Sequence, residues 1–380
     1  MDRELIDFIL STLAFFCGLF SFWKILFQRS GIPKDIDWQN MSAKILPGIS
    51  IIIPARNEEN SLPNLMNSLA IQTYKNFEII VVNDSSTDNT SLVAKEYDAE
   101  VLNLQSVPDS WLGKNWACWN GALKAKHSYL LFLDSDTVLN KNALKTIILK
   151  YLSDPSAISV QPYHYMEKPY EQLSAFFNAV LIGAMNSFSI FSKIFKPIGL
   201  FGPCIFCSTK DYFKCGGHEK VRDKVLEDLA MGQNFLKSGV KINNFIGKGI
   251  ISFRMYPGGL KNLIHGWSKS FGFGAKTSST VVLILMSLWI MGFFTALINL
   301  VRNIAEGSIF YIILSVILYL LFVSLFFAVL FKLGNFNFLI SLLYIFPAVF
   351  FCIVFVYSVA ISFLFKKVVW KSRVINLKKK

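Results

Sequence analysis

The stretch Tyr129–Asp136 restricts the possible folds more than any other part of the chain. Five consecutive aromatic or aliphatic residues lead directly into Asp134 and Asp136, which are separated by Ser135. An apolar run without polar alternation is typical of a strand buried on both faces, as in a parallel sheet covered by helices. The carboxylates would then stand at the carboxyl end of the strand, where open α/β sheets bind ligands. Such oxygens suit Mg²⁺ or Mn²⁺, and a plain turn or helix cap is the alternative.

Long apolar segments occupy both ends of the 380-residue chain, in which 53% of the residues are hydrophobic and 36 are Phe. The first is Leu5–Phe27, and three further blocks cover Val281–Val301, Phe310–Phe331 and Phe338–Phe365. Segments of this length and composition are typical of transmembrane helices. The sequence therefore predicts an N-terminal transmembrane anchor over residues 1–28 and a C-terminal transmembrane bundle over residues 279–365, with two to four crossings.

Basic residues border these segments and carry part of the net charge of +13. Lys24, Arg29, Lys34 and Lys44 follow the first segment, and residues 366–380 form a basic tail. Because cytoplasmic flanks are enriched in Lys and Arg, both regions are expected in the cytoplasm of a multi-pass cell-membrane protein. That requires an even number of C-terminal crossings. The last block, which is long and contains Pro347, would then be a hairpin, or one block would lie along the membrane surface. Charges beside spans indicate contact with the lipid bilayer and not with nucleic acid.

Between the apolar ends, residues 47–274 alternate strand-like and helix-like segments. This alternation predicts an α/β fold with a doubly wound, mostly parallel sheet. Because parallel strands present their carboxyl ends at one edge, Asp84, Asp134 and Asp136 should converge there. The predicted strands are Ser50–Pro54, Phe77–Val82, Glu100–Leu104, Tyr129–Leu133 and Ser156–Gln161, and the predicted helices begin at Leu62 or cover Thr90–Tyr97, Trp116–Lys126 and Thr137–Leu152.

A less regular half follows. Leu173–Phe195 is apolar but lies between sheet elements, so a helix lying on the membrane is expected there. A helix is expected from Glu227 through Phe235, and strands at Cys204–Cys207 and Ile250–Met255.

Four residues of this half, Cys204, Cys207, Cys215 and His218, have a spacing that could suit zinc. A strand, however, points Cys204 and Cys207 to opposite faces. Buried, unpaired cysteines are therefore the preferred interpretation.

Five short motifs resemble the family 2 glycosyltransferases, which have the nucleotide-binding GT-A fold, and they occur in the family's order. The resemblance covers roughly residues 47–274 and implies a donor half over residues 47–136 and an acceptor half over residues 137–274. The motifs are Ile53–Glu58 (IPARNE), Val82–Asp88 (VNDSSTD), Asn120–Gly121 with Ala125, Asp134–Asp136 (DSD) and Glu227–Asp228.

The resemblance implies a UDP-sugar donor whose diphosphate is bridged by Mg²⁺ or Mn²⁺. Asp136 would ligate the metal, and Asp134 would lie beside the metal and the ribose. Asp84 would accept a hydrogen bond from the uracil ring, although a helix cap is its plain alternative. The residues assigned to donor binding are Pro54, Asn57, Glu58, Asp84, Lys114, Asp134, Arg254 and Lys269.

The same resemblance assigns the catalytic acids to Glu227 and Asp228. Asp228 would take the proton of the acceptor in a direct displacement, which inverts an α-linked donor to a β-linked product. If the acceptor is a carboxylic acid, it is already ionised near pH 7, and Asp228 would mostly orient it. The alternative is a pair of acids in the first turn of a helix, where the dipole favours them.

Polymerising relatives carry a Gln-x-x-Arg-Trp signature where this chain has His265–Lys269 (HGWSK). The departure favours a single transfer over processive synthesis. Trp267 is expected near the acceptor or, equally, as an interfacial aromatic anchor. The residues assigned to acceptor binding are His218, His265 and Trp267.

Further stretches resemble one bacterial subgroup of the family, whose members glycosylate a carotenoid acid in staphyloxanthin-type pathways. This implies transfer of one hexose, expected to be glucose, to a membrane lipid such as diaponeurosporenoate. The alternatives are a glycerolipid or polyprenyl phosphate acceptor, a processive polysaccharide synthase, and an inactive scaffold, which the intact acids disfavour. Other enzymes of the same lipid pathway are expected partners. The matching stretches are Ser159–His164, Phe201–Pro203, Gly216–His218, Phe253–Tyr256 and Gly266–Lys269.

Overall fold

The computed structural model describes residues 3–27, 47–274, 279–364, 367–370 and 373–376. Packing divides the described chain into two compact units. We call residues 47–165 and 199–254 the sheet unit, and residues 3–27, 166–198 and those from 255 onward the helical unit. Two segments of the predicted 47–274 domain thus pack in the helical unit. Arg29, Lys34 and Lys44 lie outside the described residues, as does part of the basic tail.

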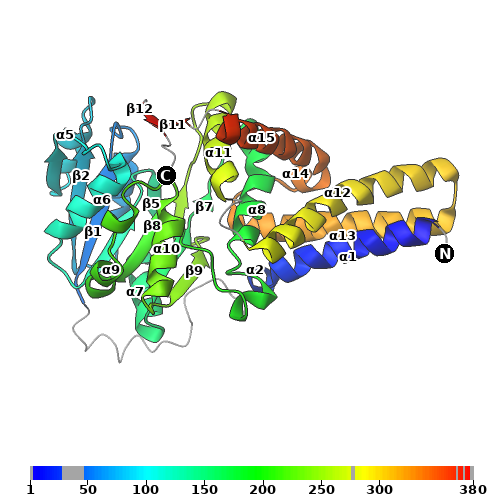
Figure 1. The fold of residues 1–380 in the computed structure, drawn as a ribbon, viewed down its shortest axis with the longest axis horizontal. Helices are drawn as coiled ribbons and strands as arrows, with labels where there is room; N and C mark the ends of the chain where they lie inside the picture. Colours follow the sequence, from blue (N-terminus) through cyan, green and yellow to red (C-terminus); the bar gives the residue numbers. More distant parts are fainter. Residues whose placement is uncertain (1–2, 28–46, 275–278, 365–366, 371–372, 377–380) are drawn as a thin grey trace. The chain divides into compact units, whose positions relative to one another are not determined.

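Seven strands form the main sheet of the sheet unit (Figure 1). Across the sheet they are β3 (Glu100–Leu104), β2 (Phe77–Asp84), β1 (Ile49–Ala55), β4 (Tyr129–Leu133), β8 (Cys204–Ser208), β6 (Ala157–Gln161) and β9 (Ile242–Ile246). β3, β2, β1 and β4 pair in parallel, β8 runs antiparallel between β4 and β6, and β9 is parallel to β6. The predicted mostly parallel α/β sheet is confirmed. Its helices are α4 (Leu62–Ala70), α5 (Thr90–Lys95), α6 (Gly113–Lys124), α7 (Ala143–Ser153), α9 (Thr209–Lys214), α10 (Glu227–Lys237) and the 3₁₀ turn η3 (Glu219–Val221).

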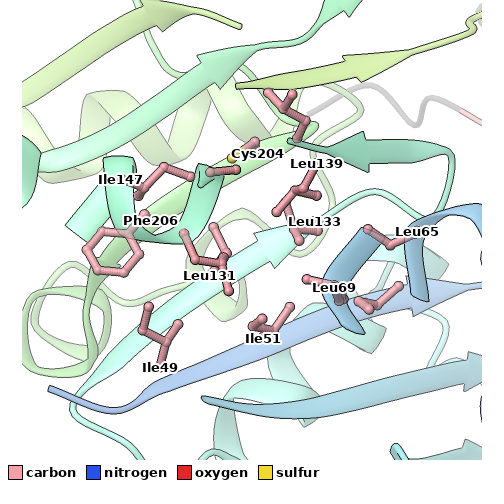
Figure 2. Packing of buried hydrophobic residues seen from close by; sticks show 14 of the residues in the cluster. Ile49, Ile51, Leu65, Leu69, Leu131, Leu133, Leu139, Ile147, Cys204 and Phe206 are labelled. Carbon is pink, nitrogen blue, oxygen red and sulfur yellow. The ribbon is translucent and has the colours of Figure 1, made fainter. Parts of the chain in front are cut away.

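Alternate residues of the central strands enter two cores, one on each face of the sheet. Ile51 and Leu131 belong to the core that includes α4 and α7 (Figure 2). Ile52 and Leu130 belong to the core that includes α6 and α10. All four side chains are 0% exposed. This double burial explains why β1 and β4 lack polar alternation.

The helix predicted over Thr137–Leu152 is wrong at its start. Residues Thr137–Leu139 form strand β5, and α7 begins only at Ala143. Thr137 and Leu139 are buried while Val138 is exposed, which is the two-residue period of a strand. β5 pairs antiparallel with β10 (Ile251–Phe253), and β10 pairs in parallel with β7 (Tyr163–His164). The first strand of this small second sheet, β5, begins directly after Asp136.

Three of the described helices are long and apolar enough to cross a membrane: α1 (Arg3–Ser21), α12 (Thr280–Glu306) and α13 (Ile309–Leu333) (Figure 1). Glycine allows close packing among them, because a Cβ at Gly18 would lie 2.0 Å from the Trp289 ring. The block predicted at Phe338–Phe365 divides into α14 (Phe338–Leu342) and α15 (Ile345–Leu364). Pro347 lies in the first turn of α15, where its missing N–H breaks no helical hydrogen bond. The number of crossings stays a prediction.

The helix predicted over Leu173–Phe195 is shorter than expected. A 3₁₀ turn, η1 (Pro169–Ser174), leads into α8 (Ala175–Ala184), and a second turn, η2 (Ile190–Lys193), follows. Asn186 has a φ of 57°, which short polar residues tolerate but a right-handed helix does not contain. α8 therefore ends at Ala184. The helical unit also contains α2 (Trp23–Phe27), α11 (Leu260–Gly274) and the antiparallel pair β11 (Lys367–Trp370) and β12 (Arg373–Asn376).

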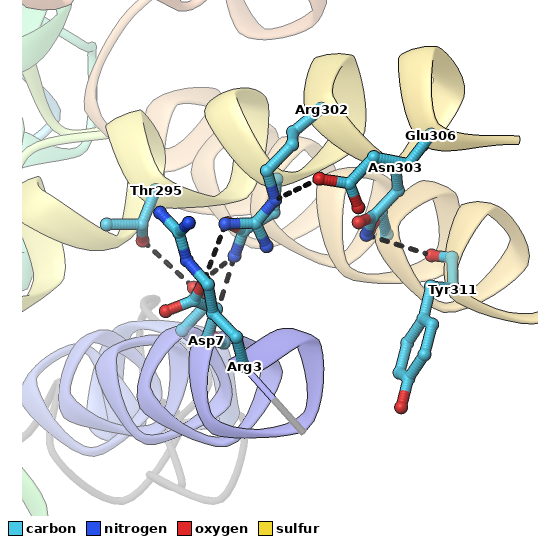
Figure 3. Close-up of polar contacts among 10 residues, drawn as sticks. Arg3, Asp7, Thr295, Arg302, Asn303, Glu306 and Tyr311 are labelled. Carbon is cyan, nitrogen blue, oxygen red and sulfur yellow. Dashed lines mark hydrogen bonds and ion pairs between the residues drawn. The ribbon is translucent and has the colours of Figure 1, made fainter. Parts of the chain in front are cut away.

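Charged side chains join α1 to α12 near the amino end of α1 (Figure 3). Arg302 Nη1 donates a hydrogen bond to Asp7 Oδ2 at 2.7 Å, and Arg302 Nε lies 3.7 Å from Glu306 Oε1. One turn further along, the Ser11 hydroxyl donates to Thr295 Oγ1 at 3.0 Å. These contacts fix which residues of the two helices face each other.

We expect the Asp7–Arg302 pair to stabilise the packing of α1 on α12. In a double-mutant cycle with Asp7→Asn and Arg302→Gln, the coupling energy should be about 0.5–2 kcal/mol, because partly buried ion pairs are screened less than exposed ones and these side chains are only 30% and 19% exposed. Chemical denaturation of the detergent-solubilised protein measures it. A cycle between Arg302→Gln and Glu306→Gln is the control, since the Glu306 side chain is 46% exposed and should couple by less than about 0.5 kcal/mol. Equal coupling in both cycles would contradict the expectation.

Candidate active site

Three parallel strands end at the same edge of the sheet. Ala55 of β1 pairs with Asn83 of β2, and Ile52 of β1 pairs with Phe132 of β4. The chain therefore leaves these strands at nearly the same level, and the polar residues there share one edge. These residues are Arg56–Glu59, Asp84–Asp88 and Asp134–Asp136.

The loops after β1 and β2 hold each other through side-chain hydrogen bonds. Asn57, whose φ is 54°, accepts a bond from the Thr87 N–H at 2.8 Å and donates its own N–H to Ser86 Oγ at 3.0 Å. The Glu58 N–H donates to Thr90 Oγ1 at 2.8 Å. The predicted donor residues Asn57 and Glu58 thus lie on a preorganised surface beside the strand ends.

Asp84 is buried at the end of β2 and has a cationic partner. Arg56 Nη1 lies 3.6 Å from Asp84 Oδ2 and donates to the Asp84 carbonyl oxygen at 3.1 Å. Asp84 is only 2% exposed, and an ionised carboxylate at that depth needs such pairing. Arg56 was not predicted as a site residue, although it stands inside the Ile53–Glu58 motif.

Lys114 links the strand edge to the first turn of α10. Its Nζ lies 2.7 Å from Asp134 Oδ1 and 3.4 Å from Glu227 Oε1. Burial opposes the charge of the ammonium, but Asp134 and Glu227 together raise the pKa of Lys114 well above its ordinary value. One permanent cation therefore joins two predicted site regions that are far apart in the sequence.

Asp136 is exposed, and the negative charges of Asp134 and Glu58 act on it. The surrounding protein limits hydration of the Asp136 carboxylate, and this is the main cause that raises its pKa to about 7. The charges of Asp134 and Glu58 raise it further. A divalent cation would relieve this repulsion. No group of three or more His, Cys, Asp or Glu suited to a metal occurs among the residues that the structure describes. The donor set fits Mg²⁺ or Mn²⁺, which commonly take one or two carboxylates and complete their shell with substrate phosphates and water.

Asp228 stands in the first turn of α10 and is held by backbone donors. Its Oδ2 accepts a hydrogen bond from the Gly202 N–H at 3.1 Å, and its Oδ1 accepts one from the Leu229 N–H at 2.9 Å. A Cβ at Gly202 would lie 3.2 Å from Asp228 Oδ2, so a side chain there would crowd the carboxylate. Burial and the neighbouring charge of Glu227 raise the pKa of Asp228 to about 7, against the opposing effect of Lys114. The carboxyl can therefore hold or release a proton near neutral pH.

Two further predicted donor residues also lie in the sheet unit. Pro54 is half-buried within β1, opposite Val82 of β2. Arg254 follows β10, where Phe253 pairs with Thr137 of β5. Because Thr137 follows Asp136, this antiparallel register brings the backbone of Arg254 to the same end of the ladder as Asp136.

His218 is covered by protein, which argues against a direct acceptor contact. It is 2% exposed, and the Tyr212 hydroxyl accepts its backbone N–H at 3.1 Å and lies 2.9 Å from its Nδ1. Burial, followed by the charge of Lys114, lowers the pKa of His218 to about 3. The imidazole is therefore neutral and packs in the core of the sheet unit.

The remaining predicted residues lie in α11 of the helical unit. His265 is exposed. Trp267 is 2% exposed, its ring stacks on Phe177 with centroids 5.0 Å apart, and its Nε1–H donates to Ser174 Oγ at 3.1 Å. The ring is thus covered by protein in the helical unit, and its assignment to the acceptor stays a prediction. The Lys269 side chain lies outside the described part of the structure.

Besides Arg56, two residues that were not predicted hold parts of the candidate site in place. The first, Gly202, stands in the stretch Phe201–Pro203 and supplies a backbone donor to Asp228. The second, Asn115, follows Lys114 and is 1% exposed. Its Nδ2 lies 2.9, 3.2 and 3.1 Å from the carbonyl oxygens of Val221, Arg222 and Lys224. No pattern in the sequence marks it, because its partners are backbone atoms about 110 residues away.

We expect Asn115→Leu to lower kcat by about 10–100-fold, because Asn115 ties the start of α6 to the loop that leads into Glu227. KM for the donor should change little, since no donor-assigned side chain is removed. The control is Gln72→Leu, another buried amide, which bonds the carbonyls of Ser68 and Asn140. It should lower the melting temperature without changing kcat. A similar kcat for both variants would contradict a positioning role for Asn115.

The fold is that of GT-A transferases. A mannosyltransferase from Pyrobaculum calidifontis, solved with GDP-Man and Mn²⁺, superimposes with a TM-score of 0.52 at 16% identity. The superposition covers 87% of this chain and 98% of that chain.

Sequence comparison gives the family. The model of Glycosyl transferase family 2 matches residues 50–213. A 4,4'-diaponeurosporenoate glycosyltransferase from Staphylococcus haemolyticus is 38% identical over 261 residues, which is 67% of this chain and 69% of that protein. The enzyme of the same name from Staphylococcus aureus strain USA300 is 31% identical over 335 residues, or 87% of this chain and 89% of that protein. The chain therefore belongs to the family 2 glycosyltransferases.

Proposed function

We propose that the protein transfers one hexose, expected to be glucose, from a UDP-sugar to a carotenoid carboxylic acid in the membrane, with inversion at the sugar. The observation that carries this proposal is the Lys114 bridge. It joins Asp134, assigned to the donor, to Glu227, the neighbour of Asp228. A cation at this position lies beside the residues assigned to the leaving diphosphate and beside the acids assigned to the acceptor. The names of the two staphylococcal relatives support the carotenoid acid as the acceptor.

The donor would lie along the strand edge. Asp84 would bind the uracil ring, and Arg56 would pair with that buried carboxylate and orient it. Asp134 and Asp136 would hold Mg²⁺ or Mn²⁺, which supplies positive charge to the diphosphate. Lys114 is a fixed cation at the same place and would stabilise the negative charge that develops on the leaving group.

The acceptor would meet the sugar at Asp228. A carboxylic acid is ionised near pH 7, so one of its oxygens can attack the anomeric carbon without losing a proton, and the bond to the UDP oxygen breaks. Two carboxylates can approach each other only if one proton lies between them. Since the pKa of Asp228 is raised to about 7, Asp228 can supply that proton as a hydrogen bond and orient the acceptor. With an alcohol acceptor, Asp228 would instead take the proton.

Residues 1–28 and 279–365 would anchor the enzyme in the cell membrane, and residues 47–274 and the tail 366–380 would lie in the cytoplasm. The three long apolar helices support this arrangement. Within it, residues 47–136 would bind the donor and residues 137–274 the acceptor, with His265 near the membrane. A cytoplasmic site would draw on the soluble pool of UDP-sugars, and neighbouring enzymes of the lipid pathway would supply the acceptor.

The test is a transfer assay with purified full-length protein, Mn²⁺ and matched donors and acceptors. UDP-glucose, UDP-GlcNAc and GDP-mannose are offered with a carotenoid acid, a diacylglycerol and a polyprenyl phosphate. We expect turnover with UDP-glucose and the carotenoid acid. A preference for GDP-mannose would contradict the role of Asp84, and a preference for another lipid would contradict the acceptor.

A further inference from the structure

A closed loop beside the end of α1 combines exposed apolar and basic side chains. It covers residues 185–198 of the helical unit, and we call it the 185–198 loop. The Ile198 N–H donates to the Met185 carbonyl oxygen at 3.3 Å, and the Asn186 amide donates to the Phe195 carbonyl oxygen. The base of the loop is thus held shut by its own hydrogen bonds. Ser189 caps the 3₁₀ turn η2 inside it, accepting the Phe191 N–H at 3.0 Å.

The 185–198 loop is fixed to the segment that follows α1. The Lys24 N–H donates to the Phe188 carbonyl oxygen at 2.8 Å, and the Phe191 ring lies 6.3 Å from the Phe20 ring, edge to face. Phe20 is in the last turn of α1, and Lys24 is in α2. A span of the length and composition of α1 therefore ends directly beside this loop.

Large apolar side chains point into solvent here. Ile194 is 74% exposed and Ile190 is 42% exposed. Phe27 of α2 is 63% exposed, and its ring is tilted against the Trp23 ring with the centroids 4.4 Å apart. Apolar residues with aromatic neighbours at the end of a span are typical of the membrane interface, where the apolar parts enter the acyl chains.

Three lysines accompany these apolar residues. Lys193 and Lys196 are exposed on the 185–198 loop, and Lys24 is half-buried beside it. Burial and the nearby charge of Lys193 lower the pKa of Lys24. Within the described residues, none of the three has an acidic side chain at ion-pair distance. The three lysines stand on two segments that the hydrogen bond from the Lys24 N–H to the Phe188 carbonyl oxygen joins. Cations without a neighbouring acid are stabilised by an external anion.

We propose that Lys24, Lys193 and Lys196 form a binding site for the phosphate headgroup of an anionic membrane lipid, with Ile190 and Ile194 inserted among its acyl chains. The occupant is a lipid and not a free phosphate, because the cations stand beside exposed apolar side chains at the end of a span. This proposal depends on α1 crossing the membrane and does not depend on the transfer reaction. It would hold the helical unit at a fixed depth in an anionic membrane.

The test is native mass spectrometry of the full-length protein released from nanodiscs that contain phosphatidylcholine and phosphatidylglycerol in equal amounts. We expect wild-type protein to retain phosphatidylglycerol preferentially. Lys24→Gln, Lys193→Gln and Lys196→Gln should each reduce that preference, by up to about fivefold. The matched control is Lys332→Gln, a lysine in the last turn of α13, which should leave the preference unchanged.

A second variant separates headgroup binding from insertion. Ile190→Ser with Ile194→Ser should reduce total lipid retained but keep the preference for phosphatidylglycerol. No donor or acceptor is present, so the result does not depend on the proposed transfer. Equal retention of the two lipids by wild-type protein would overturn the proposal, as would lysine variants that retain phosphatidylglycerol like wild type.

Discussion

Replacing Asp228 by leucine is expected to lower the rate of hexose transfer by about 10²–10⁴-fold, while UDP binding stays within about twofold of wild type. The side chain would lose its only means of holding or accepting the proton shared with the acceptor. Leucine is close in shape to aspartate but has no carboxyl group. The substitution therefore removes both the group whose pKa is raised and the acceptor of the Gly202 N–H. Steady-state kinetics and calorimetric titration with UDP measure the two quantities.

Asp223→Asn is the matched control. The Asp223 side chain is 49% exposed and lies in the loop before Glu227. Its replacement removes a carboxylate of the same segment without touching Asp228, so the rate should not change. An Asp228→Leu variant as active as Asp223→Asn would contradict the catalytic role.

Asp228→Asn distinguishes the two acceptor chemistries. Its amide can still donate a hydrogen bond to an ionised acceptor, so transfer to a carboxylic acid should fall by only about tenfold or less. Transfer to an alcohol needs a base and should fall as far as in Asp228→Leu. A loss as deep as that of Asp228→Leu with a carotenoid acid would contradict the proposed hydrogen bond from Asp228 to an ionised acceptor.

The pH profile follows from the same group. Below about pH 7 Asp228 is protonated, and above it the carboxyl ionises. With a carboxylic acid acceptor the rate should therefore fall as the pH rises above about 7, because two carboxylates repel each other. With an alcohol acceptor the rate should fall as the pH drops below about 7. A profile that is flat from pH 6 to 8 would contradict both assignments.

Removing divalent metal with EDTA is expected to lower transfer by at least about 10²-fold, and Mn²⁺ should restore it. Asp136→Asn should raise the Mn²⁺ concentration needed for half-maximal rate by about 10–100-fold. The reason is that restricted hydration and then the charges of Asp134 and Glu58 raise the pKa of Asp136, and a bound cation would offset that repulsion. Manganese titration of the transfer rate measures both effects.

The control for Asp136→Asn is the same substitution at Asp98. Asp98 is exposed in the turn between α5 and β3, away from the metal-assigned residues in sequence. Its φ is 55°, a conformation that asparagine also tolerates. Its metal response should equal that of wild type. Full activity in EDTA would contradict the metal assignment.

The sequence was sufficient to predict the central strands β1 and β4 because they are buried on both faces. Tyr129–Leu133 and Glu100–Leu104 have the predicted bounds, and Phe77–Val82 is extended by two residues to Asp84. Continuous apolar runs report such burial directly. The order of the strands and the antiparallel direction of β8 depend on contacts distant in sequence, which no local pattern encodes.

Short elements were the main failures. β5 has three residues and β7 has two, too few for a period to be recognised, so Thr137–Leu139 was assigned to the following helix. β9 (Ile242–Ile246) was missed because Asn243 and Asn244 interrupt its apolar character. Asn244 bonds the Gly199 carbonyl at 3.0 Å, a partner that appears only in the fold.

The candidate site divides in the same way. Acids at strand ends, such as Asp84 and Asp134, could be predicted because strand direction fixes their edge. Lys114 was assigned to donor binding, but its contacts with Asp134 and Glu227 were found only in the structure. Arg56, Gly202 and Asn115 act through backbone atoms or buried partners and were found only in the structure. Trp267 was assigned near the acceptor from its place beside the family signature, and its burial against Phe177 could not be read from the sequence.

The most direct test of the account is the mass and anomeric configuration of the product that purified full-length protein forms from UDP-glucose and a carotenoid carboxylic acid. We predict an adduct carrying one hexose, joined as a β-linked ester, which appears with wild type and Asp223→Asn but not with Asp228→Leu. A ladder of hexose additions, an α-linked product, or an adduct formed equally well by Asp228→Leu would contradict the proposed single, inverting transfer.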